Sequence, residues 1–326
     1  MLKSRGPPPE SRCQVLSLNK SFSTLDHVGI VVENLDMAVK HFEYLGIGPF
    51  VSLTCNTAIT HDKSDGHSTY DRSVSETRQA ALGPANIQLI QPSSKNSFWR
   101  EFLETKGEGI AHMSFVVDNI EREEEILVRN GLVSVYHDKF QEGGGVAGFE
   151  TRLFGGTLME LVQLEPESHF GGERARVPYS GFHHVGFVVR DMDAIVRYYE
   201  SLGFGPFKPL NLRGERTEAS QYGKPVSNRK LRNSGTHIGS TKVELEFLQP
   251  VENAPVQEEF LNRRGEGANH LGFKVADVDS EAAKLETKGF RAIYTTTFSS
   301  GTKSKYLDVG KTGGLLFEFW QPPTNT

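Results

Sequence analysis

The sequence predicts an α+β fold built from four βαβββ modules, which form two domains of paired, curved mixed sheets. Three observations predict this fold. The chain has 326 residues, which is enough for two ordinary domains. Its second half repeats the first half. Within each half, two segments open with a histidine and a β-rich run and close with a strand that ends in a polar pair.

The twofold repeat is clearest in two long matches. The segment "DHVGIVVENLDMAVKHFEYLGIGPF" at 26–50 recurs as "HHVGFVVRDMDAIVRYYESLGFGPF" at 183–207. The segment "GEGIAHMSF" at 107–115 recurs as "GEGANHLGF" at 265–273. A repeat of this length indicates two copies of one domain.

The repeat sets the expected boundaries. We expect a flexible extension over 1–21, an N-terminal domain over 22–166, a linker over 167–178 and a C-terminal domain over 179–322. The modules are expected at 22–92, 109–166, 179–250 and 267–322.

Each module is expected to begin with a strand that its histidine opens, at His27, His112, His184 and His270. An amphipathic helix should follow. In the first module, Leu35, Ala38, Phe42 and Leu45 share one helical face after an Asn34 cap. The third module repeats this pattern with Met192, Ile195, Tyr199 and Leu202. The helices are expected to stop at Gly46, Gly131, Gly203 and Gly289.

Each module is expected to end with a strand of the form E-φ-φ-Q, where the first position is Gln88, Glu160, Glu246 or Glu318. Side chains alternate along a strand, so the histidine and this polar residue face one side of the sheet while the apolar residues next to them in the sequence face the other. If the first and last strands of a module are neighbours, both polar side chains point into one concavity. In the third module Glu244 is an alternative to Glu246, since it lies two residues earlier on the same face.

The joint pattern indicates a metal cleft in each domain. Buried acidic groups are costly unless something neutralises them, and a divalent cation does so. Two imidazoles with two oxygen ligands suit Zn, Ni, Co, Mn or Fe(II) and leave positions open for a substrate. The only cysteines, Cys13 and Cys55, have no metal-ligand spacing, so the ligands must be histidine and oxygen donors.

These modules, with the "H-φ-G-φ-x-V" opening and the "E-φ-φ-Q" ending, resemble the vicinal oxygen chelate superfamily of glyoxalase I, bleomycin resistance and extradiol dioxygenase proteins. The pattern is most similar to methylmalonyl-CoA epimerase and to lactoylglutathione lyases of the glyoxalase I type. The resemblance covers 25–165 and 182–321. It implies one metal per paired cleft, held by His27, Gln88, His112 and Glu160 in the first domain and by His184, Glu246, His270 and Glu318 in the second.

The two implied sites differ in charge, because the first has a neutral Gln88 where the second has Glu246. Many four-module relatives, such as the hydroxyphenylpyruvate dioxygenases, keep ligands in one half, whereas this chain keeps both sets. By charge counting, we expect the first site to be the stronger Lewis acid and the second to hold its metal more tightly.

The leading functional hypothesis is metal-assisted removal of a proton next to a carbonyl, which gives epimerisation, isomerisation or lyase chemistry through a metal-stabilised enolate. The substrate would be a small anionic molecule, with CoA-linked or thiol-linked substrates included. The resemblance nominates Glu160 and Glu318 as bases as well as ligands. The epimerase's further glutamate base, on a middle strand, has only Glu76 as a weak counterpart here, which puts true epimerase activity in doubt.

Two alternatives stay open. Two histidines and one glutamate are the ligands of an Fe(II) dioxygenase, although the retained fourth ligands favour a non-redox site. A non-catalytic protein that sequesters a small molecule is the third hypothesis, because some relatives act in this way in antibiotic resistance.

The polar middles at 54–78 and 211–235 are the expected source of substrate specificity. Their candidates for contact with an anionic substrate are His61, His67, Tyr70, Arg213, Arg216, Tyr222 and Arg229. The segment "GGGVAG" at 143–148 is expected to form a flexible loop over the cleft. The two "GPF" segments, 48–50 and 205–207, are expected to turn into the next strand with the Phe packed inside.

The composition favours small molecules as partners. Hydrophobic residues make up 37%, charged residues 24%, and the net charge is -5, without the basic balance of a nucleic-acid binder. No apolar run has the length of a membrane span. We expect a cytoplasmic monomer or homodimer; the basic, Pro-rich segment 1–21 leaves organelle targeting open beside plain disorder.

Overall fold

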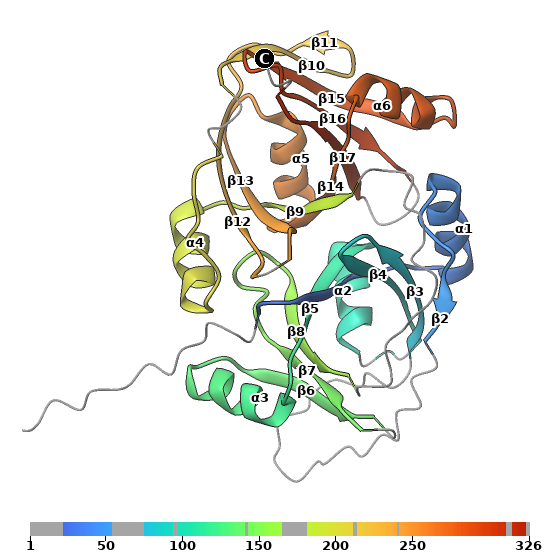
Figure 1. The fold of residues 1–326 in the computed structure, drawn as a ribbon, viewed down its shortest axis with the longest axis vertical. Helices are drawn as coiled ribbons and strands as arrows, with labels where there is room; N and C mark the ends of the chain where they lie inside the picture. The colour runs from blue at the N-terminus through green and yellow to red at the C-terminus, as the bar shows by residue number, and fades with distance from the viewer. Residues whose placement is uncertain are drawn as a thin grey trace, which may run out of the picture.

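The computed structural model describes residues 22–53, 75–93, 95, 97–140, 143–164, 181–210, 214–239, 241–310 and 315–323. They form two curved mixed sheets with six helices, which confirms the α+β class (Figure 1). The expected extension at 1–21 and the expected linker at 167–178 lie outside the described residues. Among the described helices, none is long and apolar enough to cross a membrane.

The first sheet has eight strands in the order β2-β3-β4-β1-β5-β8-β7-β6. Its elements in chain order are β1 (Leu25–Val31), α1 (Leu35–Leu45), β2 (Val51–Ser52), β3 (Ser75–Leu82), β4 (Ala85–Pro92), α2 (Phe98–Lys106), β5 (Gly109–Val116), α3 (Ile120–Arg129), β6 (Ser134–Lys139), β7 (Gly145–Phe149) and β8 (Leu158–Gln163).

The second sheet has nine strands in the order β11-β10-β15-β16-β17-β14-β9-β13-β12. Its elements are β9 (Phe182–Val188), α4 (Met192–Ser201), β10 (Arg216–Gln221), β11 (Lys224–Pro225), β12 (Lys230–His237), β13 (Glu244–Glu252), α5 (Pro255–Arg264), β14 (Gly267–Lys274), α6 (Val278–Glu286), β15 (Arg291–Phe298), β16 (Lys303–Asp308) and β17 (Leu316–Gln321).

In every module the first and last strands are neighbours, as the convergence of their polar side chains requires, and they run parallel. The pairs are β1 with β4, β5 with β8, β9 with β13, and β14 with β17. The two modules of each half then join through an antiparallel pair of opening strands, β1 with β5 and β9 with β14. The four strands that carry the candidate ligands therefore lie side by side at the centre of each sheet.

The helices begin where their caps predict. The Asn34 side chain accepts a hydrogen bond from the backbone N–H of Met37, and Gly46 ends α1 in the left-handed conformation, with φ of 97°. The buried face of α1 consists of the four predicted residues, Leu35, Ala38, Phe42 and Leu45.

The closing glutamine of each E-φ-φ-Q phrase has a structural role that the sequence did not reveal. The Oε1 atom of Gln91 accepts a hydrogen bond of 2.7 Å from the backbone N–H of Leu35, the first residue of α1. The same contact recurs in the other three modules, made by Gln163, Gln249 and Gln321 to the first residues of α3, α4 and α6. Because three positions separate the two polar ends of the phrase, one faces the concavity while the other reaches the helix.

The third module departs from the predicted βαβββ order. Its long middle forms the hairpin β10–β11, and β10 pairs with β15 of the fourth module, at the far edge of the sheet (Figure 1). The place that β2 takes in the first module is held by one isolated bridge, between Lys208 and Gly235. The hairpin therefore extends the curve of the second sheet.

Two further expectations need correction. The segment 143–148 is not a flexible loop, because residues 145–148 belong to β7, which is buried throughout and pairs with β6 and β8. In the "GPF" segments, Phe50 and Phe207 are only partly buried, although both pack against the core.

Two helices, α2 and α5, connect the modules within each half, where the sequence indicated only a linker ending in "GEG". Their apolar side chains pack on the same sheet face as the polar residues: Phe98, Trp99 and Phe102 of α2 cluster with Val31 and Leu158. Figure 1 shows α2 within the curve of the first sheet and α5 within that of the second. Each helix therefore covers the centre of its sheet.

The two halves share one hydrophobic core and meet at their GEG turns. Nζ of Lys106 donates to the carbonyl oxygen of Arg264 at 2.6 Å, and the Arg264 guanidinium donates to the carbonyl oxygen of Glu108. In each turn the glutamate side chain accepts a backbone N–H just after the opening strand, from Glu33 to Glu108 and from Arg190 to Glu266. The residues just before each GEG phrase thus join the two halves, while the glutamate of the phrase fixes it to the opening strand of its own half.

Candidate metal centres

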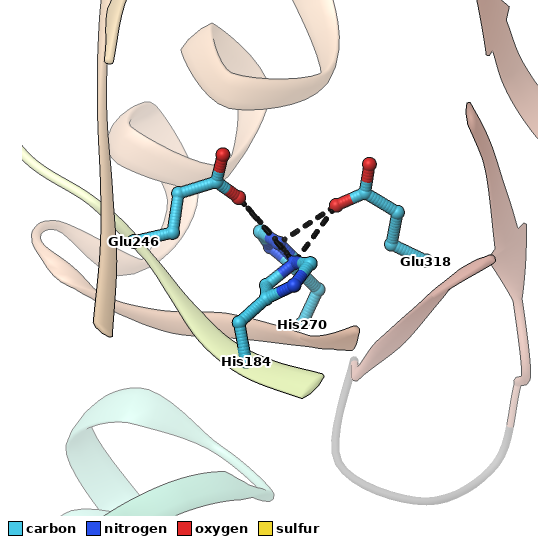
Figure 2. A group of neighbouring side chains, drawn as sticks. All are labelled: His184, Glu246, His270 and Glu318. Atoms are coloured by element: carbon cyan, nitrogen blue, oxygen red, sulfur yellow. Dashed lines mark hydrogen bonds and ion pairs between the residues drawn. The ribbon is translucent and has the colours of Figure 1, made fainter. Parts of the chain in front are cut away.

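The second sheet brings four buried side chains to one point. Figure 2 shows the imidazoles of His184 and His270 between the carboxylates of Glu246 and Glu318. The two Nε2 atoms lie 3.1 Å apart. Oε2 of Glu318 lies 2.9 Å from Nε2 of His184 and 3.3 Å from Nε2 of His270. Oε2 of Glu246 lies 3.4 and 3.3 Å from the same two nitrogens.

These separations fit one small divalent cation. Two donor atoms bound to an ion at about 2.1 Å lie about 3.0–3.4 Å apart for bond angles between a right angle and the tetrahedral angle. The four side chains are at most 2% exposed, so the two carboxylates are removed from water together. A bound cation would offset the cost of that burial.

Two of the histidines, one in each cluster, are oriented by an oxygen acceptor that contacts their outer nitrogen. Nδ1 of His270 lies 2.7 Å from Oδ1 of Asn269, and Nδ1 of His27 lies 2.6 Å from Oδ2 of Asp26. An acceptor at Nδ1 keeps the hydrogen there, which leaves the lone pair of Nε2 facing the cluster. Both imidazoles are therefore held in the tautomer that a metal ion requires.

The negative charge of the second cluster raises the pKa of His270. Burial by itself lowers this pKa, but hydrogen bonds and charge from Glu246 and Glu318 outweigh burial and raise it to about 9. Negative charge that favours a proton at this nitrogen also favours a divalent cation.

Glycines in the opening strands make room for the opposing imidazoles. A Cβ atom at Gly186 would lie 1.7 Å from Cε1 of His270, and one at Gly29 would lie 1.8 Å from Cε1 of His112. At Gly272 the same atom would lie 2.0 Å from Cε1 of His184. The "H-φ-G" opening therefore combines a ligand candidate with the space for the ring on the paired strand.

The first sheet brings His27, His112 and Glu160 together, and the fourth candidate, Gln88, lies on β4 beside the strand of His27. Nε2 of His27 lies 2.9 Å from Nε2 of His112, and Oε1 of Glu160 lies 3.7 and 3.9 Å from the two nitrogens. Gln88 occupies the register of Glu246, since it pairs with Gly29 as Glu246 pairs with Gly186. It is 6% exposed, and in the described part of the chain its amide makes no hydrogen bond to either imidazole.

Other candidates lie elsewhere. Glu244 is outside the cluster, 3.4 Å from the exposed His237. Glu76 is exposed in β3, three residues from Gln79, which is the cross-strand partner of Gln88; Glu76 therefore faces the other side of the sheet and cannot serve as the base. Tyr222 is 55% exposed at the tip of the β10–β11 hairpin. His61, His67, Tyr70 and Arg213 lie outside the described residues.

The sequence missed the residues that surround the two clusters. The Tyr136 hydroxyl donates to Oε2 of Glu160 at 2.7 Å, and the Trp99 ring lies 4.8 Å from that of His112. In the second half, the Ser304 hydroxyl donates to Oε1 of Glu318, and the Tyr306 ring lies 5.0 Å from that of His270. The apolar face of 98–102 was the only signal that α2 would lie over the site.

The comparisons with known proteins agree with this architecture. The family model described as the glyoxalase/bleomycin resistance protein/dioxygenase superfamily matches residues 26–149 and 183–306.

Three solved structures illustrate the similarity. A mutant 4-hydroxymandelate synthase from Streptomyces coelicolor is 14% identical with a TM-score of 0.60, over 93% of this chain and 94% of that one. A fusion of a xylose isomerase-like TIM barrel with 4-hydroxyphenylpyruvate dioxygenase is 13% identical with a TM-score of 0.50, over 94% of this chain and 49% of that one. Methylmalonyl-CoA epimerase from Mycobacterium tuberculosis is 21% identical with a TM-score of 0.34, over 45% of this chain and 90% of that one. At these identities the first two similarities show the fold alone.

Proposed function

Since the chain belongs to the glyoxalase/bleomycin resistance protein/dioxygenase superfamily, we propose that it is a metal-dependent enzyme that removes a proton next to a carbonyl group of a small substrate. The observation that carries the proposal is the buried cluster of His184, Glu246, His270 and Glu318. Its ligand atoms lie 2.9–3.4 Å apart in five contacts, of which four join an imidazole to a carboxylate and one joins the two imidazoles.

The proposed ligands are His27, Gln88, His112 and Glu160 in the first half and the four clustered residues in the second. The ion, which we take to be Zn, Ni, Co, Mn or Fe(II), would polarise the substrate carbonyl and stabilise the negative charge that develops on its oxygen. The proposed partner is a small anionic molecule that carries its reacting hydrogen on the carbon beside that carbonyl.

The glutamates would move the proton. A carboxylate oxygen of Glu318 takes the hydrogen as H⁺ from the α-carbon, and the electron pair of the broken C–H bond moves toward the carbonyl oxygen. The hydrogen bond from Ser304 to Oε1 holds this carboxylate in place while Oε2 faces the imidazoles. In the first half, Tyr136 holds Glu160 in the same way. Return of the proton to the same carbon gives epimerisation, and return to a neighbouring atom gives isomerisation.

A second candidate function follows from the first half. Its cluster of His27, His112 and Glu160 is the two-histidine, one-carboxylate set of Fe(II) oxygenases, and the fourth position holds the neutral Gln88 in place of a second carboxylate. This observation favours an Fe(II)-dependent dioxygenase in that half.

Solvent exchange tests the main proposal. Protein loaded anaerobically with Co, Ni or Zn is incubated in deuterated water with methylmalonyl-CoA or S-lactoylglutathione, and deuterium at the α-carbon is measured by NMR. We expect deuterium to enter one of these substrates, and the double variant Glu160→Gln, Glu318→Gln to slow it by about 100-fold or more.

The control separates the alternatives. Iron-loaded protein is given 4-hydroxyphenylpyruvate and oxygen, and oxygen consumption is recorded. Oxygen uptake without deuterium exchange would replace the main proposal with the dioxygenase. If neither reaction occurs but one of the three compounds binds tightly, a non-catalytic binding protein is favoured.

A further inference from the structure

Arg229 is a buried cation that has no carboxylate partner among the described residues. It immediately precedes β12 and is 8% exposed. Its guanidinium donates to Oε1 of Gln257 at 3.0 Å and lies 4.3 Å from the ring centre of Tyr294. Within the described part of the chain, no carboxylate oxygen lies within 4.0 Å of it. A buried charge in this state is costly unless an anion joins it.

Two more polar groups beside Arg229 lack partners. The Tyr294 hydroxyl and the Nε2 atom of Gln257 are buried and make no hydrogen bond to any described residue. Tyr294 is 2% exposed and Gln257 is fully buried. Both groups can donate, so the guanidinium, Nε2 of Gln257 and the Tyr294 hydroxyl form a set of three neighbouring donors. Among the described residues only the guanidinium has an acceptor, which is Oε1 of Gln257.

This donor set is close to the second candidate metal centre. The Tyr294 ring lies 6.1 Å from that of Tyr306, which in turn lies 5.0 Å from the ring of His270. Burial lowers the pKa of Arg229, while Tyr294, Tyr306 and, to a smaller extent, the charge of Glu318 act in the opposite direction. Arg229 is therefore within electrostatic reach of the cluster that we assign to the metal.

The described part of the first half has no equivalent. The position of Gln257 in α5 is that of Trp99 in α2, 158 residues earlier, and the Tyr136 hydroxyl is already bonded to Glu160. The donor set thus distinguishes the two halves.

We propose that Arg229, Gln257 and Tyr294 form a carboxylate-binding pocket in the second half, so that its substrate carries a carboxylate in addition to the carbonyl that reacts. The assignment of this carboxylate to a substrate rests on the function proposed above. A single carboxylate matches the single positive charge of the pocket and the planar donor geometry of a guanidinium. A doubly charged phosphate would leave surplus negative charge near Glu246 and Glu318.

Binding of ¹³C-acetate to metal-free protein tests the pocket without any metal or turnover. Acetate is small enough to enter a site built for any carboxylate, and its NMR line width reports binding; acetamide is the uncharged control. We expect broadening for acetate alone. Arg229→Gln should weaken binding by about tenfold or more, and Tyr294→Phe by about three- to tenfold.

Two variants keep the outcome decisive. Tyr294→Phe removes only a hydroxyl that has no partner, so it should fold normally even if Arg229→Gln does not. The matched control Arg232→Gln removes the same charge three residues later, at an exposed position in β12 that pairs with Asp193, and it should leave acetate binding unchanged.

The proposal is overturned if acetate does not broaden, if acetamide broadens equally, or if Tyr294→Phe and Arg229→Gln match the control. Each result is independent of metal content and of deuterium exchange. Failure of the pocket is therefore distinguishable from failure of the proposed function.

Discussion

The Tyr136 hydroxyl donates a 2.7 Å hydrogen bond to Glu160, whereas Tyr294, 158 positions later, leaves its hydroxyl unbonded in the described structure. The reason lies on the neighbouring strand. A Cβ atom at Gly148 would lie 2.3 Å from the Tyr136 ring, so this glycine makes room for the ring. The register of Gly148 is taken by Tyr306 in the second half. One glycine-to-tyrosine difference thus gives the two clusters different surroundings.

Tyr136→Phe should therefore weaken metal binding in the first half only. The hydroxyl fixes a carboxylate that is a proposed ligand, and loss of such a contact typically costs about 10–100-fold in metal affinity. Competition with a chromophoric chelator measures this in the background of His270→Ala, which removes the second site. Tyr294→Phe in the same background is the control and should have no effect; equal losses in both would show that the Tyr136 contact does not support the site.

Gly186→Ala should destabilise the second half and reduce its metal content, because the added methyl group would overlap the His270 ring. We expect a loss of about 1–3 kcal/mol in the free energy of unfolding, measured with denaturant. Ser114→Ala is the control. Ser114 pairs with His27 as Gly272 pairs with His184, and Ser114 already carries a Cβ atom, so the change to alanine adds no atom beside the ring. An alanine at 186 that costs no more than the control would contradict the packing argument.

The second half should hold its metal more tightly than the first, because Glu246 supplies a carboxylate where Gln88 supplies an amide. Glu246→Gln should weaken the second site by about tenfold or more, which corresponds to ~1.4 kcal/mol. The reciprocal change, Gln88→Glu, should strengthen the first site. Isothermal titration with Zn in the single-site backgrounds His112→Ala and His270→Ala measures both effects. If Gln88 and Glu246 are unchanged and the first site, measured in His270→Ala, binds Zn more tightly than the second site, measured in His112→Ala, the charge argument is contradicted.

The His137–Glu124 ion pair should make stability depend on pH. The hydrogen bond from Glu124 raises the pKa of His137 against the opposing effect of burial. Burial would raise the pKa of Glu124, but hydrogen bonds from His137 and Ser134 outweigh it and lower this pKa. The histidine contribution is complete below its unfolded value of 6.5 and is lost as pH rises through the raised value. The glutamate contribution is present above 4.5 and is lost as pH falls through the lowered value.

His137→Gln should therefore cost more stability at pH 5.5 to 6 than at pH 9. Denaturant unfolding at both pH values measures the difference. Arg129→Gln is the control, because its exposed pair with Glu125 carries the same charges at both values. A cost for His137→Gln that does not change with pH would show that the pair is not ionised as inferred.

The sequence was sufficient for the architecture because its signals repeat four times. A histidine and an E-φ-φ-Q phrase at matching places locate the first and last strands of each module, and convergence of their polar side chains requires these strands to be neighbours. Their parallel direction was not predicted and comes from the structure. The helix caps could be predicted because they are local: Asn34 and Gly46 contact the backbone of the helix whose ends they mark.

Features that depend on distant partners were not visible. The pairing of β10 with β15 joins segments about 80 residues apart, so a local pattern at 214–226 reads only as a polar loop. Arg229 was one of seven candidates in such loops, and its burial depends on Gln257 and Tyr294, which come from α5 and β15. The glycines at 145 and 148 suggested a loop because their role is close packing against the neighbouring strand. Gly145 packs against the backbone of Asp138 and Gly148 against the Tyr136 ring, and these are tertiary contacts.

Metal content tests the central claim most directly. Protein purified without added chelator and without oxygen is analysed by inductively coupled plasma mass spectrometry, as wild type and as His112→Ala and His270→Ala. Two buried clusters that each hold one ion predict about two equivalents in the wild type and about one in each variant. A wild type without metal, or two variants that both keep the wild-type content, would contradict the account.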